Sequence, residues 1–347
     1  MSTLTVADRL HGAPSLTRFW AGLGGVCMTL AVAGFILAQR FEFPADIAVP
    51  VVAAFCWQAA LYCAAVSSPV RNWVCGALAP FALAAALVAV SVTPYVIYAI
   101  PTGLFVLESL ARLVLLCACV TLPYVLFPVT RQRFAWQDLV VACALAYPMI
   151  SGLSPMFREI YQGFDPPAHR LDALGKLMLI PMGLYVFLGL RKLQGTAFRL
   201  LPRRQDWRPA LDSATYSLPW IVIVGLSTGY LRWDPPLADP LGAIAGAVGK
   251  LLGIYFTTAL AEEFLMRGVV QNLLAASLGR PLIAQGVAAV LFGAVHLGRG
   301  DFPNWGYAAT AAVLGWFCGR AYLKSGSVTP AMITHALAVA GQELFFE

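Results

Sequence analysis

The amino-acid sequence predicts an all-α fold, a polytopic bundle of transmembrane helices with roughly ten or eleven membrane segments. Two features of the composition and one of the pattern lead to this prediction. Of the 347 residues, 60% are hydrophobic and 12% are charged, and the mean hydropathy is +0.75. A soluble globular protein carries about a quarter charged residues. Within lipid only helices and closed barrels satisfy their backbone, and the apolar runs lack the alternation of barrel strands.

The apolar runs are the predicted helices, since about 20 mostly apolar residues cross a bilayer. The first run, near residues 19–38, follows Arg9 and Arg18. It is long and no small-residue cleavage site follows it, so we expect a signal anchor rather than a cleaved signal peptide. Further runs lie near residues 47–66, 74–92, 113–128, 139–153, 174–190, 218–230, 241–260, 281–297, 305–323 and 328–346.

The basic residues of the loops predict the orientation in the membrane. With a cytoplasmic N-terminus, four of them fall outside, namely Arg40, Arg158, Arg170 and Arg232. Eleven fall inside, namely Arg9, Arg18, Arg71, Arg131, Arg133, Arg191, Lys192, Arg199, Arg203, Arg204 and Arg208. Arg112 and Lys176 sit at span edges and are left out of the count. The excess favours a cytoplasmic N-terminus. The Ala-, Leu- and Arg-rich composition indicates a bacterial cytoplasmic (inner) membrane.

A polar, basic stretch at residues 191–217 separates two parts of the chain. It carries Trp207, and such a stretch is typical of a cytoplasmic loop or of an interfacial helix near anionic lipid. We therefore expect an N-terminal transmembrane bundle over residues 1–190, this loop or helix over 191–217, and a C-terminal domain over 218–347.

Two function classes are excluded by where the charges and cysteines lie. The net charge of +6 comes from short loops between apolar runs, which is the positive-inside pattern and not a nucleic-acid-binding face. The eight cysteines lie in or beside apolar runs, with no CxxC pair and no Cys/His ligand spacing. We interpret them as buried small hydrophobic residues, and they imply neither disulfides nor a metal site held by cysteines.

Ionisable residues inside apolar sequence mark the C-terminal part, where AEEFLMRGVV carries Glu262, Glu263 and Arg267. Glu263 and Arg267 are four residues apart, so they share a helix face and can form an ion pair that acts as a structural clamp. Glu262 points about 100° away and needs a partner from another helix. His296 or His335, both deep in apolar sequence, can supply it; the alternative for each is a core histidine bound to a backbone carbonyl.

A carboxylate beside an imidazole in a pocket that excludes water can act as a general base. A second histidine can donate a hydrogen bond to a developing oxyanion. Phe292 lies four residues before His296 and shares its face. Since no serine, cysteine or threonine stands out as a nucleophile, the chemistry that fits these residues is attack by an activated water.

EEFLMR resembles the EExxxR motif of the CPBP intramembrane proteases, the glutamic-type peptidases related to the eukaryotic CAAX-processing endopeptidase. FGAVH is similar to their FxxxH motif, and His335 to their later membrane-embedded histidine. The resemblance covers about residues 241–341 and implies a CPBP-type helical core and an intramembrane protease domain. It implies that Glu262 activates water, that His296 shuttles the proton and that His335 helps form the oxyanion hole. Glu263 and Arg267 would support the site, and no cofactor is implied.

One position departs from the resemblance: Val339 stands where the family often has a small polar residue. Either another donor takes its place, with Asn304 or Thr334 as the candidates and Gln342 near in sequence, or the activity is weak. A second expectation concerns the topology, because straight spans would put Glu262 and His296 at opposite ends. We therefore expect an irregularity, either a long helix over about residues 253–276 or a re-entrant segment after His296.

The function predicted is an intramembrane endopeptidase that hydrolyses a membrane-anchored protein or peptide, with the lipid bilayer as its other partner and no nucleic acid. The relatives suggest either cleavage after a prenylated cysteine or maturation of a C-terminally anchored substrate. One alternative is a non-catalytic scaffold or immunity protein of the same fold. Another is a zinc protease, with Glu262 or Glu263 and both histidines as ligands. The last alternative is a proton-coupled transporter that uses Glu108 and Arg112. The competing interpretation of these two residues is a simple ion pair at a helix end.

Overall fold

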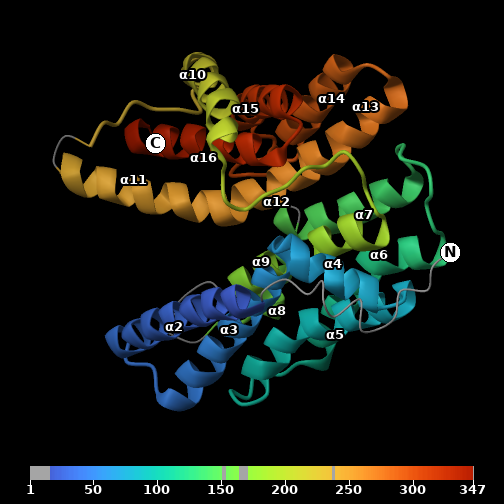
Figure 1. Cartoon of the computed structure of the whole chain (residues 1–347). Helices are drawn as coiled ribbons and strands as arrows, with labels where there is room; N and C mark the ends of the chain where they lie inside the picture. The colour runs from blue at the N-terminus through green and yellow to red at the C-terminus, as the bar shows by residue number, and fades with distance from the viewer. Residues whose placement is uncertain (1–15, 151–153, 164–170, 237–238, 347) are drawn as a thin grey trace. The chain divides into compact units, whose positions relative to one another are not determined.

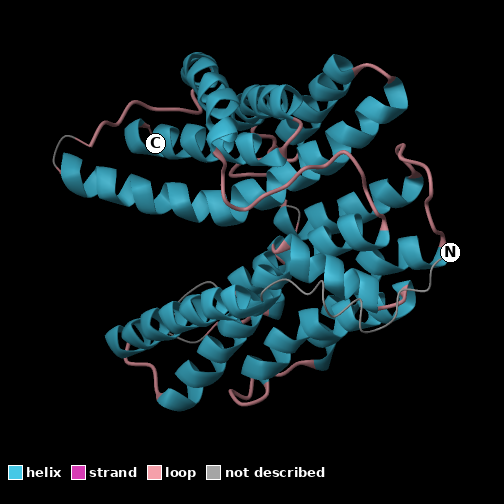
Figure 2. Ribbon diagram, in the orientation of Figure 1, coloured by secondary structure: helices cyan, strands magenta, loops and turns pink. Residues whose placement is uncertain are grey.

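The computed structural model describes residues 16–150, 154–163, 171–236 and 239–346. These residues are helical almost throughout, and no strand occurs among them (Figure 2). Two isolated β-bridges are present, Ala197 with Ser327 and Trp233 with Phe346. The predicted all-α helical bundle is confirmed. Arg9 and Arg170, which enter the charge count, lie outside the described residues.

Seven helical stretches in the described ranges are long and apolar enough to cross a membrane. They are Phe19–Arg40, Ala45–Val66, Pro80–Ala99, Leu107–Leu126, Asp172–Leu190, Arg204–Ser227 and Pro240–Leu278. The protein is therefore an integral membrane protein. The apolar runs alone suggest a larger count because they do not show where helices break. The run near 139–153 holds the 11-residue helix α7 (Trp136–Ala146), and that near 281–297 holds the 14-residue helix α14 (Pro281–Ala294).

The chain divides into two compact units, residues 1–128 with 156–192 and residues 129–155 with 193–347. The first unit contains α2 (Leu16–Arg40), α3 (Ala45–Val66), α4 (Ser68–Ala77), α5 (Pro80–Ala99), α6 (Leu107–Leu126), α8 (Met156–Ile160), α9 (Asp172–Tyr185) and the π-helical η2 (Val186–Leu190). The predicted boundaries at residues 190 and 217 stay a prediction. Within the basic stretch 191–217, residues from Arg204 onward form the first half of a helix.

The second unit contains α7, the short η1 (Tyr147–Met149), α10 (Arg204–Ser227), α14, α15 (Trp305–Ser325), α16 (Val328–Phe345) and one long helical run. That run joins α11 (Pro240–Ile254), η3 (Tyr255–Ala259), α12 (Leu260–Glu263), η4 (Phe264–Gln271) and α13 (Asn272–Leu278) (Figure 1). Both α10 and α14 pack on α15, and α16 packs on α10, α11 and α15.

The long run is the irregularity that the topology requires. It has 39 residues, which at 1.5 Å per residue is about 58 Å, well beyond the roughly 30 Å of a hydrocarbon core. The two glutamates lie near the middle of this run rather than at its end. Two π-helical stretches, η3 and η4, flank them directly; such stretches are frequent at functional sites. The run ends at Gly279, whose φ of 65° suits glycine.

Two small residues on α15 let the helices of this unit approach closely. A Cβ placed on Gly315 would lie 3.1 Å from the Phe292 ring and 3.2 Å from Nη2 of Arg267. One placed on Gly319 would lie 2.7 Å from Cγ of Gln285. Gly242 and Gly246 on α11 have the same four-residue spacing but do not serve a close helix contact. A Cβ on Gly242 would meet the capping Asp239, and one on Gly246 would have no neighbour within 4 Å.

All eight cysteines are free thiols, and they differ in burial: Cys27, Cys56, Cys63 and Cys75 are partly buried, and the predicted burial is wrong for Cys119 and Cys143. Only Cys117 and Cys318 are buried, while Cys119 and Cys143 are exposed. A thiol on a helix that faces lipid needs no protein neighbours, so an apolar run does not predict burial inside the protein.

Candidate active site

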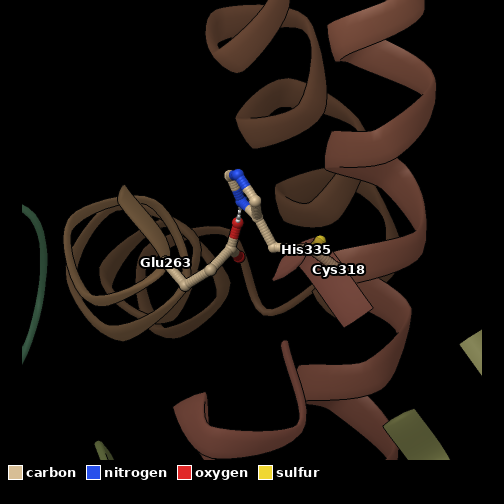
Figure 3. A group of neighbouring side chains, drawn as sticks. All are labelled: Glu263, Cys318 and His335. Atoms are coloured by element: carbon tan, nitrogen blue, oxygen red, sulfur yellow. Dashed lines mark hydrogen bonds and ion pairs between the residues drawn. The ribbon is translucent and has the colours of Figure 1, made fainter. Parts of the chain in front are cut away.

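Four segments of the second unit bring the ionisable residues of the C-terminal region together. The long run supplies Glu262, Glu263 and Arg267 from α12 and η4, and α16 supplies His335. Helix α14 supplies Phe292, and α15 supplies a small face at Gly315. Figure 3 shows Glu263 reaching from the long run to His335, with Cys318 of α15 nearby.

Glu263 binds two partners, one with each carboxylate oxygen. Its Oε2 lies 2.9 Å from Nη1 of Arg267, which is the ion pair predicted from their spacing. Its Oε1 lies 2.8 Å from Nδ1 of His335, which the sequence did not predict. Glu263 and Arg267 are completely buried, and His335 is nearly so. Glu263 is thus more than a clamp for Arg267, because it also holds the imidazole.

Arg267 is held in place by three kinds of contact. It pairs with Glu263, its Nη2 donates to the carbonyl of Gly315 at 2.6 Å, and its guanidinium lies 4.8 Å from the centre of the Phe292 ring. A guanidinium offers a rigid fork of donors that suits a carboxylate. Arg267 therefore supplies the counter-charge beside Glu263 in a fully buried position.

Glu262 differs from Glu263 in exposure and in partners. About 27% of its side chain is exposed, and its Oε2 lies 3.9 Å from Nε2 of His335. That separation is too long for a hydrogen bond, although both atoms can contact one water. Glu262 is therefore the carboxylate of the pair that solvent or substrate can reach, and His335 is the partner from another helix that the sequence required.

His296 follows the end of α14 and contacts aromatic rings on two sides. Its Nδ1 lies 2.6 Å from the carbonyl oxygen of Phe292, so this nitrogen is the donor in the neutral ring. The imidazole lies 4.8 Å from the Phe292 ring and 5.0 Å from the Tyr307 ring, between centroids. Its contacts among the described residues do not include Glu262 or His335.

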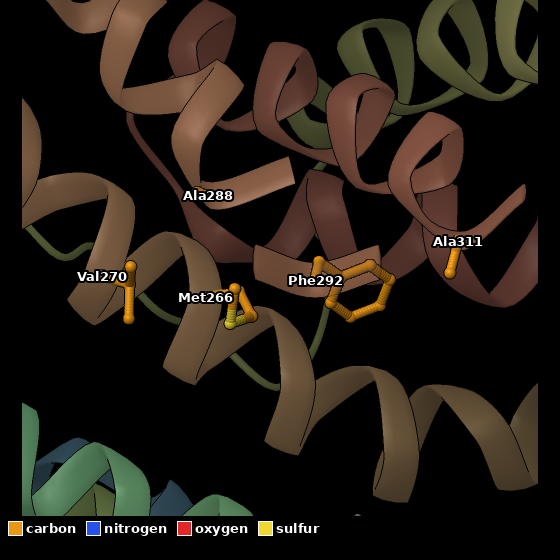
Figure 4. Packing of buried hydrophobic residues seen from close by; sticks show 5 residues of the cluster. All are labelled: Met266, Val270, Ala288, Phe292 and Ala311. Atoms are coloured by element: carbon orange, nitrogen blue, oxygen red, sulfur yellow. The ribbon is translucent and has the colours of Figure 1, made fainter. Parts of the chain in front are cut away.

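Phe292 connects the two histidines. Its ring lies 4.8 Å from that of His296 and 6.0 Å from that of His335, in addition to its contact with Arg267. Figure 4 shows it within a buried cluster with Met266, Val270, Ala288 and Ala311. The predicted shared face of Phe292 and His296 is present, and the cluster fixes the ring against which both imidazoles lie.

The two predicted oxyanion donors both make hydrogen bonds to nearby backbone. The Thr334 hydroxyl is buried and lies 2.9 Å from the carbonyl of Pro330 and 3.1 Å from that of Ala210. The amide of Asn304 caps α15, accepting from the backbone nitrogen of Tyr307 and donating one of its two hydrogens to the carbonyl of Arg299. The sequence did not reveal these backbone partners, and a role for either side chain in place of Val339 stays a prediction.

Tyr307 is a residue that sequence reasoning missed. It lies edge-on to His296, its ring stacks on Tyr230 at 4.8 Å, and its hydroxyl accepts from Nη1 of Arg299 at 2.6 Å. An aromatic residue within FPNWGY carries no motif, so only the packing of α15 against the end of α14 could have found it.

The residues that lie close enough together to hold a metal ion are not those predicted as zinc ligands. Glu263, Cys318 and His335 have potential ligand atoms within 4.8 Å of one another, and His296 is not among them. All three are buried, and Glu263 already pairs with the Arg267 cation at 2.9 Å. A dication at this point would face that guanidinium and would lack the open position that a catalytic zinc needs for water. These residues do not fit a catalytic zinc.

Comparison with known protein families finds a match in the same region of the chain. Residues 244–341 match the family described as type II CAAX prenyl endopeptidase Rce1-like. No curated protein matches the chain. No solved structure matches it either. The matched residues span the long helical run from α11 onward and end within α16, so they contain every residue of the site described above.

Proposed function

Because residues 244–341 match the family described as type II CAAX prenyl endopeptidase Rce1-like, we propose that the protein is an intramembrane endopeptidase that cleaves a membrane-anchored protein or peptide with an activated water. The single observation that carries the proposal is the arrangement around His335. One nitrogen of the ring is bound by the buried Glu263, and the other lies 3.9 Å from the accessible Glu262.

In the proposed reaction Glu262 is the general base. A water lies against its carboxylate, gives up a proton to it and attacks the carbonyl carbon of the scissile peptide bond. The C–N bond then breaks, and the proton passes to the departing nitrogen, so that the products are one carboxylic acid and one amine. We assign the relay to His296, because Nδ1 is bound to the carbonyl of Phe292 and Nε2 is left to accept and return a proton.

His335 and Tyr307 are the proposed donors to the oxyanion. The bond from Nδ1 to Glu263 sets the orientation of His335, and Nε2 lies toward Glu262, where the reaction would take place. The proposed donor is the imidazolium form of the ring, because both of its nitrogens carry a hydrogen. The Tyr307 hydroxyl accepts its hydrogen bond from Arg299, so its own hydrogen remains available. This assignment replaces the donor that Val339 lacks.

The substrate class follows from where the catalytic residues lie. Glu262 and Glu263 are in the middle of a 39-residue apolar helical run, so a substrate must bring its peptide bond to that depth. A prenylated C-terminus and a C-terminal membrane anchor both meet this requirement. The name of the matching family favours the first, and the bacterial composition favours the second.

Mapping of the new chain ends in membrane proteins tests the proposal. Cells that carry the wild-type protein, the Glu262→Gln variant or neither are compared by quantitative mass spectrometry of protein termini. We expect one or more termini within or beside membrane anchors that require wild-type protein and are absent with the variant. Identical termini in all three samples, with the wild-type protein and the variant present at equal levels, would overturn the proposal and favour a non-catalytic scaffold.

The transporter alternative gains no support from Glu108 and Arg112. Arg112 binds Glu108 at 2.5 Å and also Glu159 at 2.9 Å. All three side chains are about half exposed or more. A charge pathway through a bundle requires ionisable groups that face its interior, whereas this network is an exposed ion pair at the start of α6.

A further inference from the structure

A basic groove lies at the beginning of α10, apart from the candidate active site. Its volume is about 980 Å³. The end of α15 forms its other wall. The charged residues that line it are Arg203, Arg204, Arg208, Lys324, Asp206 and Asp212.

Both acids of the groove already have cationic partners. Asp206 is buried, lies 3.1 Å from Nη2 of Arg199 and also accepts from the backbone nitrogen of Arg203. Asp212 lies 3.5 Å from Nζ of Lys324. This pairing leaves the guanidinium groups of Arg203, Arg204 and Arg208 without an acidic partner in the parts of the chain that the structure describes. The groove therefore carries an uncompensated charge of three arginines.

The walls of this groove are fixed by the fold. The hydroxyl of Thr329, in the first turn of α16, donates to the carbonyl of Arg199 at 2.8 Å and accepts from its backbone nitrogen at 3.2 Å. The backbone nitrogen of Val328 donates to the carbonyl of Ala197 at 2.9 Å. These bonds hold the segment before α10 against α16, so the arginines project from a backbone with a set course.

The position of the groove identifies its surroundings as the membrane interface. The charged end of α10 precedes an apolar stretch of the same helix, which is one of the candidate membrane spans. Leu201 and Trp207 are exposed beside the arginines, with 72% and 45% of their surfaces accessible. Exposed tryptophan next to arginine at the end of a span is the usual composition of an anchor at the lipid headgroups.

We propose that this groove binds the phosphate of an anionic phospholipid headgroup. Guanidinium groups bind phosphate oxygens through paired, charge-assisted hydrogen bonds. Three of them line this groove, and its two carboxylates are paired with other cations. The exposed Leu201 and Trp207 would lie against the acyl region of the same lipid. A lipid is favoured over free phosphate because the groove opens where the span leaves the bilayer.

Lipid binding by the full chain, purified in neutral detergent, tests the assignment. The probes are short-chain phosphatidylglycerol, short-chain phosphatidylcholine and inorganic phosphate, and the readouts are native mass spectrometry and the shift of the unfolding temperature. The test variant is R203Q/R204Q/R208Q. The matched control is R40Q/R158Q/R280Q, which removes the same charge from exposed positions elsewhere.

We expect phosphatidylglycerol to bind the wild-type protein at least tenfold more tightly than phosphatidylcholine, and the test variant to lose that preference while the control keeps it. Equal binding of phosphatidylglycerol by the test variant and the control would overturn the proposal. If inorganic phosphate displaces the lipid at similar concentrations, the site is one for free anions and the lipid assignment is wrong. Should the triple variant fail to fold, R204Q and R208Q alone must each weaken binding, and unchanged binding in both would refute the proposal.

Discussion

The carboxylate of Glu263 ties the imidazole of His335 to the long helical run, with 2.8 Å between Oε1 and Nδ1. The same carboxylate pairs with Arg267 through its other oxygen. Glu263 holds Nδ1 of the His335 ring, and the other ring nitrogen, Nε2, lies on the side of Glu262. The adjacent acids thus differ in their surroundings: Glu263 holds the histidine from the buried side, and Glu262 is partly exposed.

Replacing Glu263 by glutamine should destabilise the protein strongly. The change leaves the Arg267 cation fully buried without a counter-charge, and breaking a buried pair from one side costs about 3–5 kcal/mol. The measurement is the unfolding free energy or the unfolding temperature in detergent. The double variant E263Q/R267M removes both charges and should recover part of the loss. A single variant as stable as the wild type would show that the ion pair does not support the fold.

Replacing Glu262 by glutamine should leave the fold intact and stop cleavage. Its side chain is partly exposed and makes no ion pair closer than the 3.9 Å approach to His335. Loss of a general base lowers the rate by about 10²–10⁴-fold. The matched control is Glu343→Gln. It removes an acid near the end of α16 that pairs with Lys250 of α11. The assignment fails if E262Q cleaves at the rate of that control.

Local spacing predicted the parts of the site that lie on one helix. Four-residue spacing gave the Glu263–Arg267 pair and the shared face of Phe292 and His296, and both are present. Helical geometry also separated Glu262 from Glu263. These relationships depend only on the rise and turn of one helix, so a single sequence is enough to derive them.

Contacts between helices could not be derived in the same way. The Glu263–His335 bond joins residues 72 positions apart and depends on how α12 packs against α16. Tyr307 approaches His296 only because α15 begins beside the end of α14. The apolar pattern likewise predicted where helices lie but not the π-helical stretches around the glutamates, because hydrophobicity does not distinguish hydrogen bonds between residues four apart from those between residues five apart.

Adding a methyl group to Gly315 or Gly319 should destabilise the second unit. A Cβ on Gly319 would lie 2.7 Å from Cγ of Gln285, and one on Gly315 would press on Phe292 and Arg267. Overpacking of this kind typically costs about 1–3 kcal/mol. Gly246→Ala is the matched control, because it adds the same methyl group to a helix with no neighbour within 4 Å. Unfolding temperatures of the three variants give the comparison, and equal values would contradict the close packing of α15.

Removal of divalent metal should leave cleavage unchanged. The acid, thiol and imidazole that gather at the site are closed in by Arg267, and a guanidinium repels a dication. Cleavage is measured before and after treatment with a strong chelator, and metal content is measured on the same sample. Cys318→Ala is the companion variant and should retain cleavage. Loss of activity on chelation that is restored by zinc would reverse this assignment.

Replacing Tyr307 by phenylalanine should slow cleavage without weakening substrate binding. The change keeps the ring that stacks on Tyr230 and contacts His296, and it removes only the hydroxyl. If that hydroxyl donates to the oxyanion, its loss should lower kcat by about 10²–10³-fold and leave KM nearly unchanged.

Tyr322→Phe is the matched control for that experiment. It removes a hydroxyl from the same helix, one that lies 3.2 Å from the carbonyl of Gly195, away from the histidines. It should lower stability slightly and leave kcat unchanged. If both variants lose kcat to the same extent, the effect comes from the packing of α15, and the donor in place of Val339 is not Tyr307.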